Sequence, residues 1–421
     1  MNREAVPGTP AAPPAQTSFA ALRHPAYRGY FLTAALAMMA DNIEHVISYW
    51  LLFERFHSPA LGGIAVLTHW LPFLLFSVYA GALADRFDLR RIIQLAQILF
   101  MVVSLGWAVL FLTGHIAVWH AVVLLTIHGL AGVLWSPAGQ LLVHDIVGPA
   151  ELQSAVRLNA TSRNLGLLLG PAVGGLLMLL VEPKAIGLLI NVLFYVPLII
   201  WCQRARRSAP RVSAARRART SQLADLLEAL RRVSSDRTIM LMLGVAAGSS
   251  FFIGTAIQAQ MPEFAHDLGT GKADISYSVL LGANAAGAFF GGLILEMRAL
   301  LGAKPQSAIV LAILWCFALL GFAVTQNYVV AVCLMAVAGF LNLAFTAMAQ
   351  TLVQLHSPQE LRGRVIGLYN VAANGMRSFS GVTIGMLGAL IGIHWSLALS
   401  ALAMFAVAMV LLAFGLRFSK Q

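Results

Sequence analysis

Long runs of apolar residues alternate along the chain with short polar segments. Read in windows of about 20 residues, each run is long enough to cross a hydrocarbon core of about 30 Å as a helix. The pattern predicts an all-α membrane protein with about twelve transmembrane helices. The predicted spans lie near residues 30–54, 61–83, 92–113, 117–143, 158–181, 184–203, 237–259, 275–297, 306–325, 328–354, 364–391 and 393–416.

Composition agrees with this interpretation. Of the 421 residues, 59% are hydrophobic and 11% are charged, whereas a soluble protein carries about 25% charged residues. Aqueous cores could not hide so large an apolar excess, although the length alone would suit two or three soluble domains.

The net charge of +11 is unevenly distributed. If both termini are cytoplasmic, nearly all of the 28 lysines and arginines fall on the cytoplasmic side. This bias follows the positive-inside rule and predicts the orientation. Contact with anionic lipids explains the arginine-rich stretch between Trp201 and Met240 more simply than binding to nucleic acid does. The exceptions are the outward Arg55, Lys184 and Lys272 and the intramembrane Arg163 and Arg377.

Two cytoplasmic turns recur in the second half of the chain. The turn at Gly81–Arg86 returns at Gly292–Arg298, 211 residues later, and the turn at Pro149–Val156 returns at Pro358–Val365, 209 residues later. Two repeats at nearly one offset predict two homologous six-helix bundles, an architecture that binds substrate between its halves near the midplane. The predicted parts are a mobile segment (1–29) with an interfacial helix at its end, an N-terminal bundle (30–203), a basic cytoplasmic linker (204–236), a C-terminal bundle (237–417) and a tail (418–421).

The first of these turns, GALADRFDLRR, resembles the loop signature of the major facilitator superfamily. The stretch GLLLGPAVGG resembles the fifth-helix motif of the exporters in that superfamily, G-x-x-x-G-P-x-x-G-G. With LRHPAYRGYF before the first span, the chain looks most like the bacterial branch that holds the enterobactin exporter and macrolide efflux proteins. The resemblance implies the major facilitator fold, secondary active transport and export.

Within the loop signature, the resemblance implies a conformational latch, because Asp85 can accept hydrogen bonds from a helix N-terminus or an arginine. The alternative is a solvated loop whose arginines only set the topology. The latch residues are Gly81, Asp85, Arg86 and Arg90, with Glu296 and Arg298 in the second half.

The exporter motif has glycines four residues apart, which let two helices approach closely, and a proline that bends its helix. Tight packing without any transport role is the alternative. The motif residues are Gly166, Gly170, Pro171, Gly174 and Gly175.

The first span carries Asp41, Glu44 and His45 on one helix face near mid-bilayer. A charge there costs about 3 kcal/mol on insertion scales, so these groups are expected to face a central cavity. We predict a proton-coupling site led by Asp41, with Glu44, His45 and His128 shaping its affinity. A neutralised structural cluster, with Asp41 paired to His45, is the alternative.

His128 occupies a position where exporters of this superfamily often carry an arginine, in HGLAG of the fourth span. Arg163 and Arg377 lie in the equivalent fifth and eleventh spans, where they can hold an anionic group or pair with the carboxylates. Snorkelling of either arginine to the surface is the alternative. The predicted substrate cavity comprises Asp41, Glu44, His69, Trp70, Arg163 and Arg377.

No cofactor or metal site is expected. The isolated Cys202, Cys316 and Cys333 offer no ligand spacing. Glu263, His266 and Asp267, in an outward loop, have a spacing that a metal accepts, but a solvated loop explains them better.

The favoured function is a secondary active transporter, not an enzyme, that exports amphipathic small molecules of the drug or siderophore type by proton antiport and alternating access across the bacterial inner membrane.

 The chain has no GxxxxGK[ST] and no GxSxG, so ATP hydrolysis and a membrane-embedded hydrolase are disfavoured. A lysophospholipid flippase is the alternative within transport, and a non-transporting sensor or a membrane-embedded enzyme is the alternative outside it. The expected partners are a small-molecule substrate, protons and membrane lipids, with no nucleic acid, and the protein is expected to be a monomer.

Overall fold

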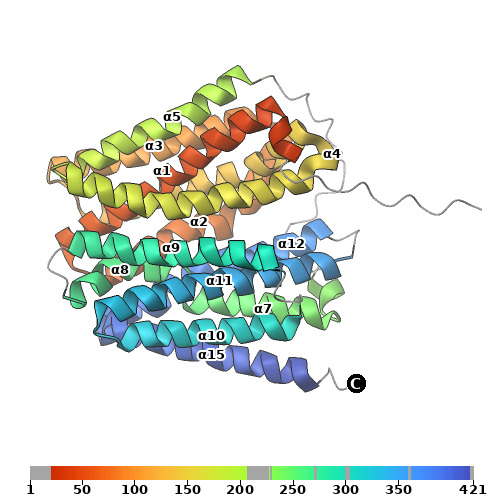
Figure 1. The fold of residues 1–421 in the computed structure, drawn as a ribbon. Helices are drawn as coiled ribbons and strands as arrows, with labels where there is room; N and C mark the ends of the chain where they lie inside the picture. The colour runs from red at the N-terminus through yellow and green to blue at the C-terminus, as the bar shows by residue number, and fades with distance from the viewer. Residues whose placement is uncertain are drawn as a thin grey trace, which may run out of the picture.

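The computed structural model describes residues 20–205, 227, 230–269, 273–298, 304–358 and 362–417. These residues form helices joined by short turns, with no strand among them (Figure 1). The predicted N-terminal segment up to residue 19, most of the basic linker and the C-terminal tail lie outside the described residues.

The N-terminal bundle contains five helices after a short 3₁₀ turn. The fourth of them is twice as long as a span because two helices are joined end to end at Gly148, whose backbone angles are φ 71° and ψ 176°. This left-handed conformation favours glycine, and it separates the predicted fourth and fifth spans. The elements are η1 (Ala20–Arg23), α1 (Pro25–Phe56), α2 (Pro59–Arg86), α3 (Leu89–Leu112), α4 (Val118–Leu180) and α5 (Ile186–Arg204).

The first helix differs from its predicted bounds. It begins at Pro25 rather than Tyr30, so the residues expected to form an interfacial helix largely belong to α1 itself. Proline at the first helical position satisfies the helix geometry and loses no hydrogen bond there.

The C-terminal bundle is less regular than the first. Its first span is broken at Gly254 into two helices that meet at 41°. Its fifth span contains two π-helical segments on either side of Arg377. The elements are α7 (Arg237–Phe252), α8 (Ala256–Asp267), α9 (Ala273–Arg298), α10 (Pro305–Val324), α11 (Tyr328–His356), α12 (Arg362–Asn370), η2 (Val371–Gly375), α13 (Arg377–Ser380), η3 (Gly381–Met386), α14 (Leu387–Ile391) and α15 (Ile393–Arg417).

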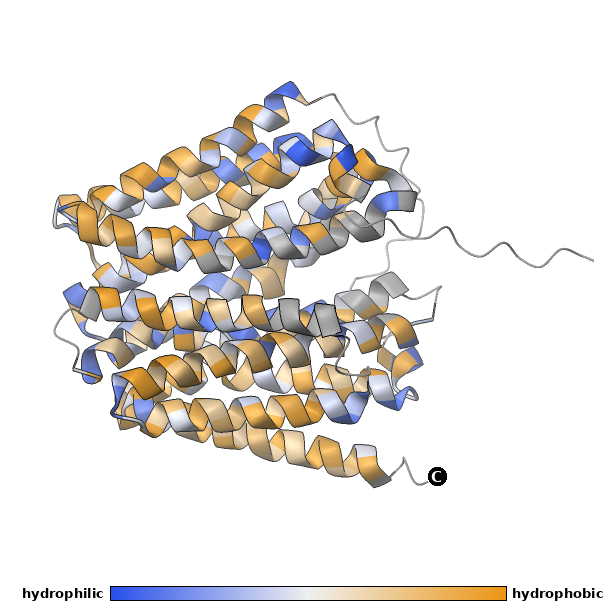
Figure 2. Cartoon of the chain, viewed as in Figure 1, coloured by the Kyte–Doolittle hydropathy of each residue, from blue (hydrophilic) through white to orange (hydrophobic). Residues whose placement is uncertain are grey.

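Seven of the described helices are long and apolar enough to cross a membrane, or eight if the bent pair α7 and α8 counts as one span. Neither α1 nor the run from α12 to α14 is among them, and the second half of α4 and α9 contribute shorter apolar stretches, Leu169–Leu180 and Ile275–Phe290, within the described residues. Figure 2 shows hydrophobic residues along the lengths of the helices and hydrophilic residues gathered near many of their ends. Together the described segments form the two six-helix bundles expected from the repeat.

The two bundles lie side by side, with α1–α5 in one and α7–α15 in the other (Figure 1). Between them α2 contacts η3 and α13, and α4 contacts α9. A Cβ placed on Gly63 of α2 would collide with the backbone of Gly381 and Gly385, so α2 and η3 touch through backbone atoms. Gln260 donates a hydrogen bond across the same region to the carbonyl oxygen of Pro59, at 2.6 Å. These contacts join the bundles at their predicted outer end.

Candidate functional site

The polar face of the first span lies halfway along α1. Asp41 is the seventeenth of the 32 residues of this helix, counted from Pro25, and Glu44 and His45 lie within the next turn. The side chain of Asp41 is 23% exposed and that of Glu44 is 2% exposed. Of the two carboxylates, Asp41 is therefore the one in contact with solvent-accessible space.

His128 of α4 bridges the two carboxylates. Its Nε2 lies 2.7 Å from Asp41 Oδ1 and its Nδ1 lies 2.8 Å from Glu44 Oε1, while its side chain is 1% exposed. The sequence also allowed a pair between Asp41 and His45, but in the structure the Asp41 carboxylate pairs with His128. His45 instead contacts the backbone carbonyl oxygen of Asp41 through Nδ1, at 2.7 Å.

The two hydrogen bonds of this bridge require at least two protons on its three side chains. A neutral imidazole donates from one nitrogen only, so it can hydrogen-bond one ionised carboxylate but not two. Both contacts are satisfied if His128 is an imidazolium, or if one carboxyl group is protonated and donates to the ring. In either case the three side chains share two protons. The second oxygen of Glu44, Oε2, is buried and has no hydrogen-bond partner among the described residues.

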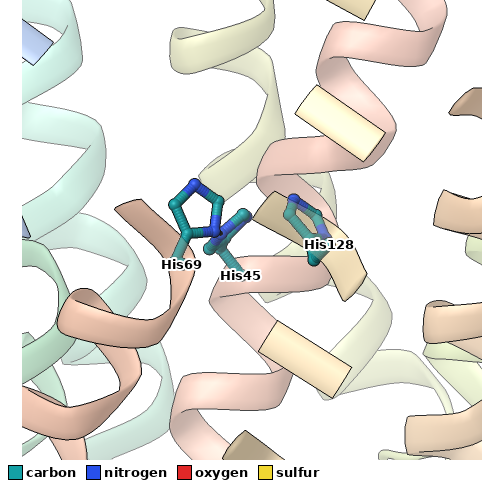
Figure 3. Close-up of side chains that lie close together, drawn as sticks. All are labelled: His45, His69 and His128. Atoms are coloured by element: carbon teal, nitrogen blue, oxygen red, sulfur yellow. Dashed lines mark hydrogen bonds between the residues drawn. The ribbon is translucent and has the colours of Figure 1, made fainter. Parts of the chain in front are cut away.

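His69 of α2 completes the polar cluster. Its Nδ1 lies 3.4 Å from His45 Nε2, and the two rings meet edge to face with centroids 4.9 Å apart. His69 also lies next to His128, with ring centroids 5.0 Å apart. Figure 3 shows the three imidazoles gathered from three different helices.

The two intramembrane arginines lie outside the carboxylate bridge. Arg377, on α13, donates from Nε to the carbonyl oxygen of Ala373 at 3.0 Å, and its guanidinium carbon lies 5.0 Å from the centre of the Trp70 ring. Arg163, in the second half of α4, is exposed and lies within electrostatic range of both Asp41 and Arg377. In the described part of the chain, the carboxylates of Asp41 and Glu44 pair with His128 and not with either arginine.

The exporter motif holds α1 in place. Three of its glycines face three residues of α1 at the same four-residue spacing: Gly166 faces Met38, Gly170 faces Asn42 and Gly174 faces Val46. A Cβ on any of these glycines would meet α1 within van der Waals distance. The fourth glycine, Gly175, faces Ser278 of α9 in the other bundle, and Pro171 is buried. The close approach predicted for these glycines is therefore present, and one of its contacts, at Asn42, is with the residue next to Asp41.

The loop signature makes contacts within the N-terminal bundle. Arg90 is buried, donates to Asp88 Oδ2 at 2.6 Å from Nη2, and donates from Nη1 to the carbonyl oxygen of Ala205 at 2.5 Å. Asp88 also accepts from the backbone N–H of Arg90 and so caps the start of α3. The Arg90 guanidinium holds the pKa of the Asp88 carboxyl below its usual value. The side chains of Gly81, Asp85, Arg86, Glu296 and Arg298, on which the latch depends, lie outside the described residues.

Sequence reasoning missed two features of this site. Asp88 was not recognised as the partner of Arg90, although an aspartate directly before a helix is a common cap. The bridging role of His128 has no local signal, because His128 lies 84 residues from Glu44 and 87 from Asp41.

Two six-helix bundles side by side are the architecture of the major facilitator fold. In agreement, the structure superposes on that of a nucleoside transporter (NupG) with a TM-score of 0.73, at 12% identity, over 92% of this chain and 99% of that one. The family model described as transmembrane secretion effector matches residues 16–421. The chain belongs to this family of the major facilitator superfamily, whose members are transporters and not enzymes.

Relatives with known roles include exporters. The chain is 23% identical over 378 residues to the enterobactin exporter EntS of Shigella boydii, and this match covers 87% of this chain and 86% of the relative. It is also 23% identical over 151 residues to the staphyloferrin A transporter of Staphylococcus aureus. That second match spans little more than a third of either protein, with 35% of this chain and 38% of the relative covered.

Proposed function

We propose that this protein exports amphipathic small molecules across the bacterial inner membrane by alternating access, in exchange for protons. The observation that carries the proposal is the bridge from Asp41 through His128 to Glu44, halfway through the N-terminal bundle. Ionisable groups at this depth are expensive and mark ion or substrate pathways. Family membership and the enterobactin exporter among the relatives support the direction.

In this proposal Asp41 takes up and releases the transported proton. Its carboxylate is the more exposed of the two, so it can exchange protons with the side of the membrane to which the site is open. Glu44 and His128 are buried behind it and hold a proton that need not leave. His45 and His69 surround the bridge and adjust its affinity for the proton.

The substrate is held between the bundles by the two arginines and by aromatic side chains. Arg163 and Arg377 supply positive charge for an anionic group, and Trp70 supplies an apolar face beside Arg377. Trp70 in turn packs against Phe73, with ring centroids 5.1 Å apart. A molecule with an anionic group on an aromatic or apolar body fits this combination, and the enterobactin exporter among the relatives supports a substrate of the siderophore type.

Exchange of substrate for protons requires that the two compete for the site. If protonation of Asp41 weakens substrate binding, reciprocal coupling makes inward proton flow drive substrate outward. The loop signature between α2 and α3 acts as the latch of one conformation. The protein works as a monomer with both termini in the cytoplasm, and its basic linker contacts anionic lipids.

The test is transport into or out of proteoliposomes under an imposed pH gradient, with a panel of amphipathic dyes and a catecholate as probes. Asp41→Asn keeps the shape of the side chain but cannot lose a proton, so it should abolish gradient-driven transport and retain some substrate exchange. Glu44→Gln should impair coupling as well, because it removes one acceptor of the bridge.

Glu54→Gln is the matched control, since Glu54 lies on the same helix but pairs with Lys184 at the predicted outer end, at 2.7 Å. It should transport like the wild type. Undiminished gradient-driven transport in both Asp41→Asn and Glu44→Gln would show that the bridge is a structural cluster.

A further inference from the structure

Three histidines from three helices converge in the N-terminal bundle. His45 comes from α1, His69 from α2 and His128 from α4, and one ring nitrogen from each lies within 4.8 Å of the others. Figure 3 shows the rings of His69 and His45 close together and His128 beside them. The sequence predicted no metal site, because no two of these residues have a ligand spacing along the chain.

The spacing between the first two ligand atoms already suits a metal. In a tetrahedral site with metal–nitrogen bonds of about 2.0–2.1 Å, neighbouring ligand atoms lie about 3.3–3.4 Å apart. His45 Nε2 and His69 Nδ1 lie 3.4 Å apart. As a hydrogen bond between two neutral rings this distance is long. The other nitrogen–nitrogen distances among the three histidines are within 4.8 Å. Shortening them to the tetrahedral value requires movements of about 1 Å or a little more.

The groups behind the ligand atoms orient them as in known metal sites. Metal-binding histidines usually donate their second ring N–H to a carbonyl or carboxylate, which fixes the tautomer. A carbonyl oxygen only accepts, so His45 must donate from Nδ1 to the carbonyl of Asp41, at 2.7 Å. That leaves a lone pair on Nε2 of the neutral ring, which points towards His69. His128 in turn contacts Glu44 through Nδ1, at 2.8 Å.

A fourth ligand is available beside the triad. Asp41 Oδ1 lies 2.7 Å from His128 Nε2. A bound ion would replace this direct hydrogen bond by one bond to the imidazole and one to the carboxylate. The two carboxylates of the cluster would also offset the charge of a divalent cation in an apolar bundle.

We propose that His45, His69 and His128, with Asp41, form a binding site for a divalent transition-metal ion of the zinc class. Imidazole nitrogens with one carboxylate suit Zn²⁺, Co²⁺ and Ni²⁺, whereas Mg²⁺ and Ca²⁺ require a shell of oxygens. The site goes beyond the proposed export function, because it would take the ion whether or not an organic substrate is transported.

The direct test is metal binding by the purified full-length protein in lipid nanodiscs, stripped with chelator and carrying no histidine tag. Calorimetry with Zn²⁺ should show one ion per chain. Co²⁺ should bind at the same site and produce the intense visible absorption of tetrahedral coordination.

His69→Gln is the informative variant, because His69 contacts His45 but neither carboxylate, so the bridge through His128 is left intact. It should weaken Zn²⁺ binding by at least about tenfold, since even loss of an outer-shell partner costs 10–100-fold, and it should abolish the cobalt absorption. His394→Gln removes a histidine of the other bundle, whose Nδ1 contacts the carbonyl oxygen of Ala323, and should bind both metals like the wild type.

Absence of stoichiometric Zn²⁺ binding in the wild type would overturn the proposal, and so would equal binding in His69→Gln and His394→Gln. The assay involves no transport, so its outcome is separate from that of the export proposal. Metal binding without gradient-driven dye transport would refute the proposed function alone, and normal dye transport without metal binding would refute this inference alone.

Discussion

Replacing Gly170 by alanine should push α1 away from α4 and disturb the carboxylate bridge. A Cβ at this position would lie 3.2 Å from both the Cα and the carbonyl carbon of Asn42, and closer still to its Cβ. Carbon atoms pack best at about 3.5–4.0 Å. None of these three atoms moves when a side chain rotates, so the clash with Cβ, the closest of them, requires the helix to retreat by about 1 Å or more.

The energetic cost has two opposing parts. Overpacking in a well-packed interior typically costs about 1–3 kcal/mol, whereas glycine to alanine within a helix gains about 1 kcal/mol in helix propensity. Gly282→Ala on α9 isolates the second part, because nothing lies within 4 Å of a Cβ placed there. The difference in stability between the two variants should therefore equal the overpacking cost, about 1–3 kcal/mol.

Thermal unfolding of both variants in the same detergent measures this difference, with Gly170→Ala melting a few degrees below Gly282→Ala. Transport under a pH gradient should fall in Gly170→Ala only, because Asn42 adjoins Asp41 and a shift of α1 would disturb the 2.7 Å contact between Asp41 and His128. Equal melting temperatures and equal transport in the two variants would refute the idea that the glycines position the site.

Three further predictions concern the predicted cytoplasmic end and the orientation. Asp88→Asn keeps a capping side chain but loses the ion pair with Arg90, so it should destabilise the protein by roughly 1–2 kcal/mol at pH 7. Arg90 lowers the folded-state pKa of Asp88, so the stability that the ion pair contributes is present above the unfolded pKa of about 3.9 and is lost as pH falls through the folded pKa. Chemical unfolding of the wild type and Asp88→Asn between pH 7 and pH 3 should show their stability difference shrink only below about pH 5. Asp85→Asn should slow transport while leaving substrate affinity nearly unchanged, because a latch biases a conformation without touching substrate; lost binding with normal residual turnover would contradict this. In a background without the native cysteines, a cysteine at Lys272 should react with an impermeant reagent from outside and one at Arg217 only after permeabilisation, and the reverse pattern would invert the orientation.

Much of the fold follows from the sequence because the membrane imposes a simple rule on it. Apolar runs long enough to cross the bilayer must be helices, since no water is available to satisfy an open backbone. The irregular elements were harder to foresee. The break at Gly254 and the π-helical segments beside Arg377 depend on how neighbouring helices pack, and a hydropathy pattern contains no signal for either.

The site was predicted one helix at a time and not as an assembly. The polar face of α1 is visible in the sequence because carboxylates are so unusual in an apolar run. Which partner each carboxylate takes depends on how α1 packs against both halves of α4, because Gly170 and Gly174 of the second half contact α1 while His128 belongs to the first half. Local spacing therefore favoured His45 as the partner of Asp41, whereas packing between the helices selects His128.

The helix that carries both carboxylates, α1, is not among the helices apolar enough to cross a membrane, although it is 32 residues long. Asp41 and Glu44 lie on α1, Arg163 on the second half of α4, and Arg377 between two π-helical segments. Each ionised group at mid-bilayer costs about 3 kcal/mol on insertion scales, so these segments gain less from the membrane than their apolar neighbours. They are retained in the bundle by contacts with other helices, which for α1 are the glycines of α4 and the bridge through His128. α1 therefore depends on packing more than on hydropathy for its place in the bundle, and this packing holds in mid-span the polar groups that the proposed export mechanism uses.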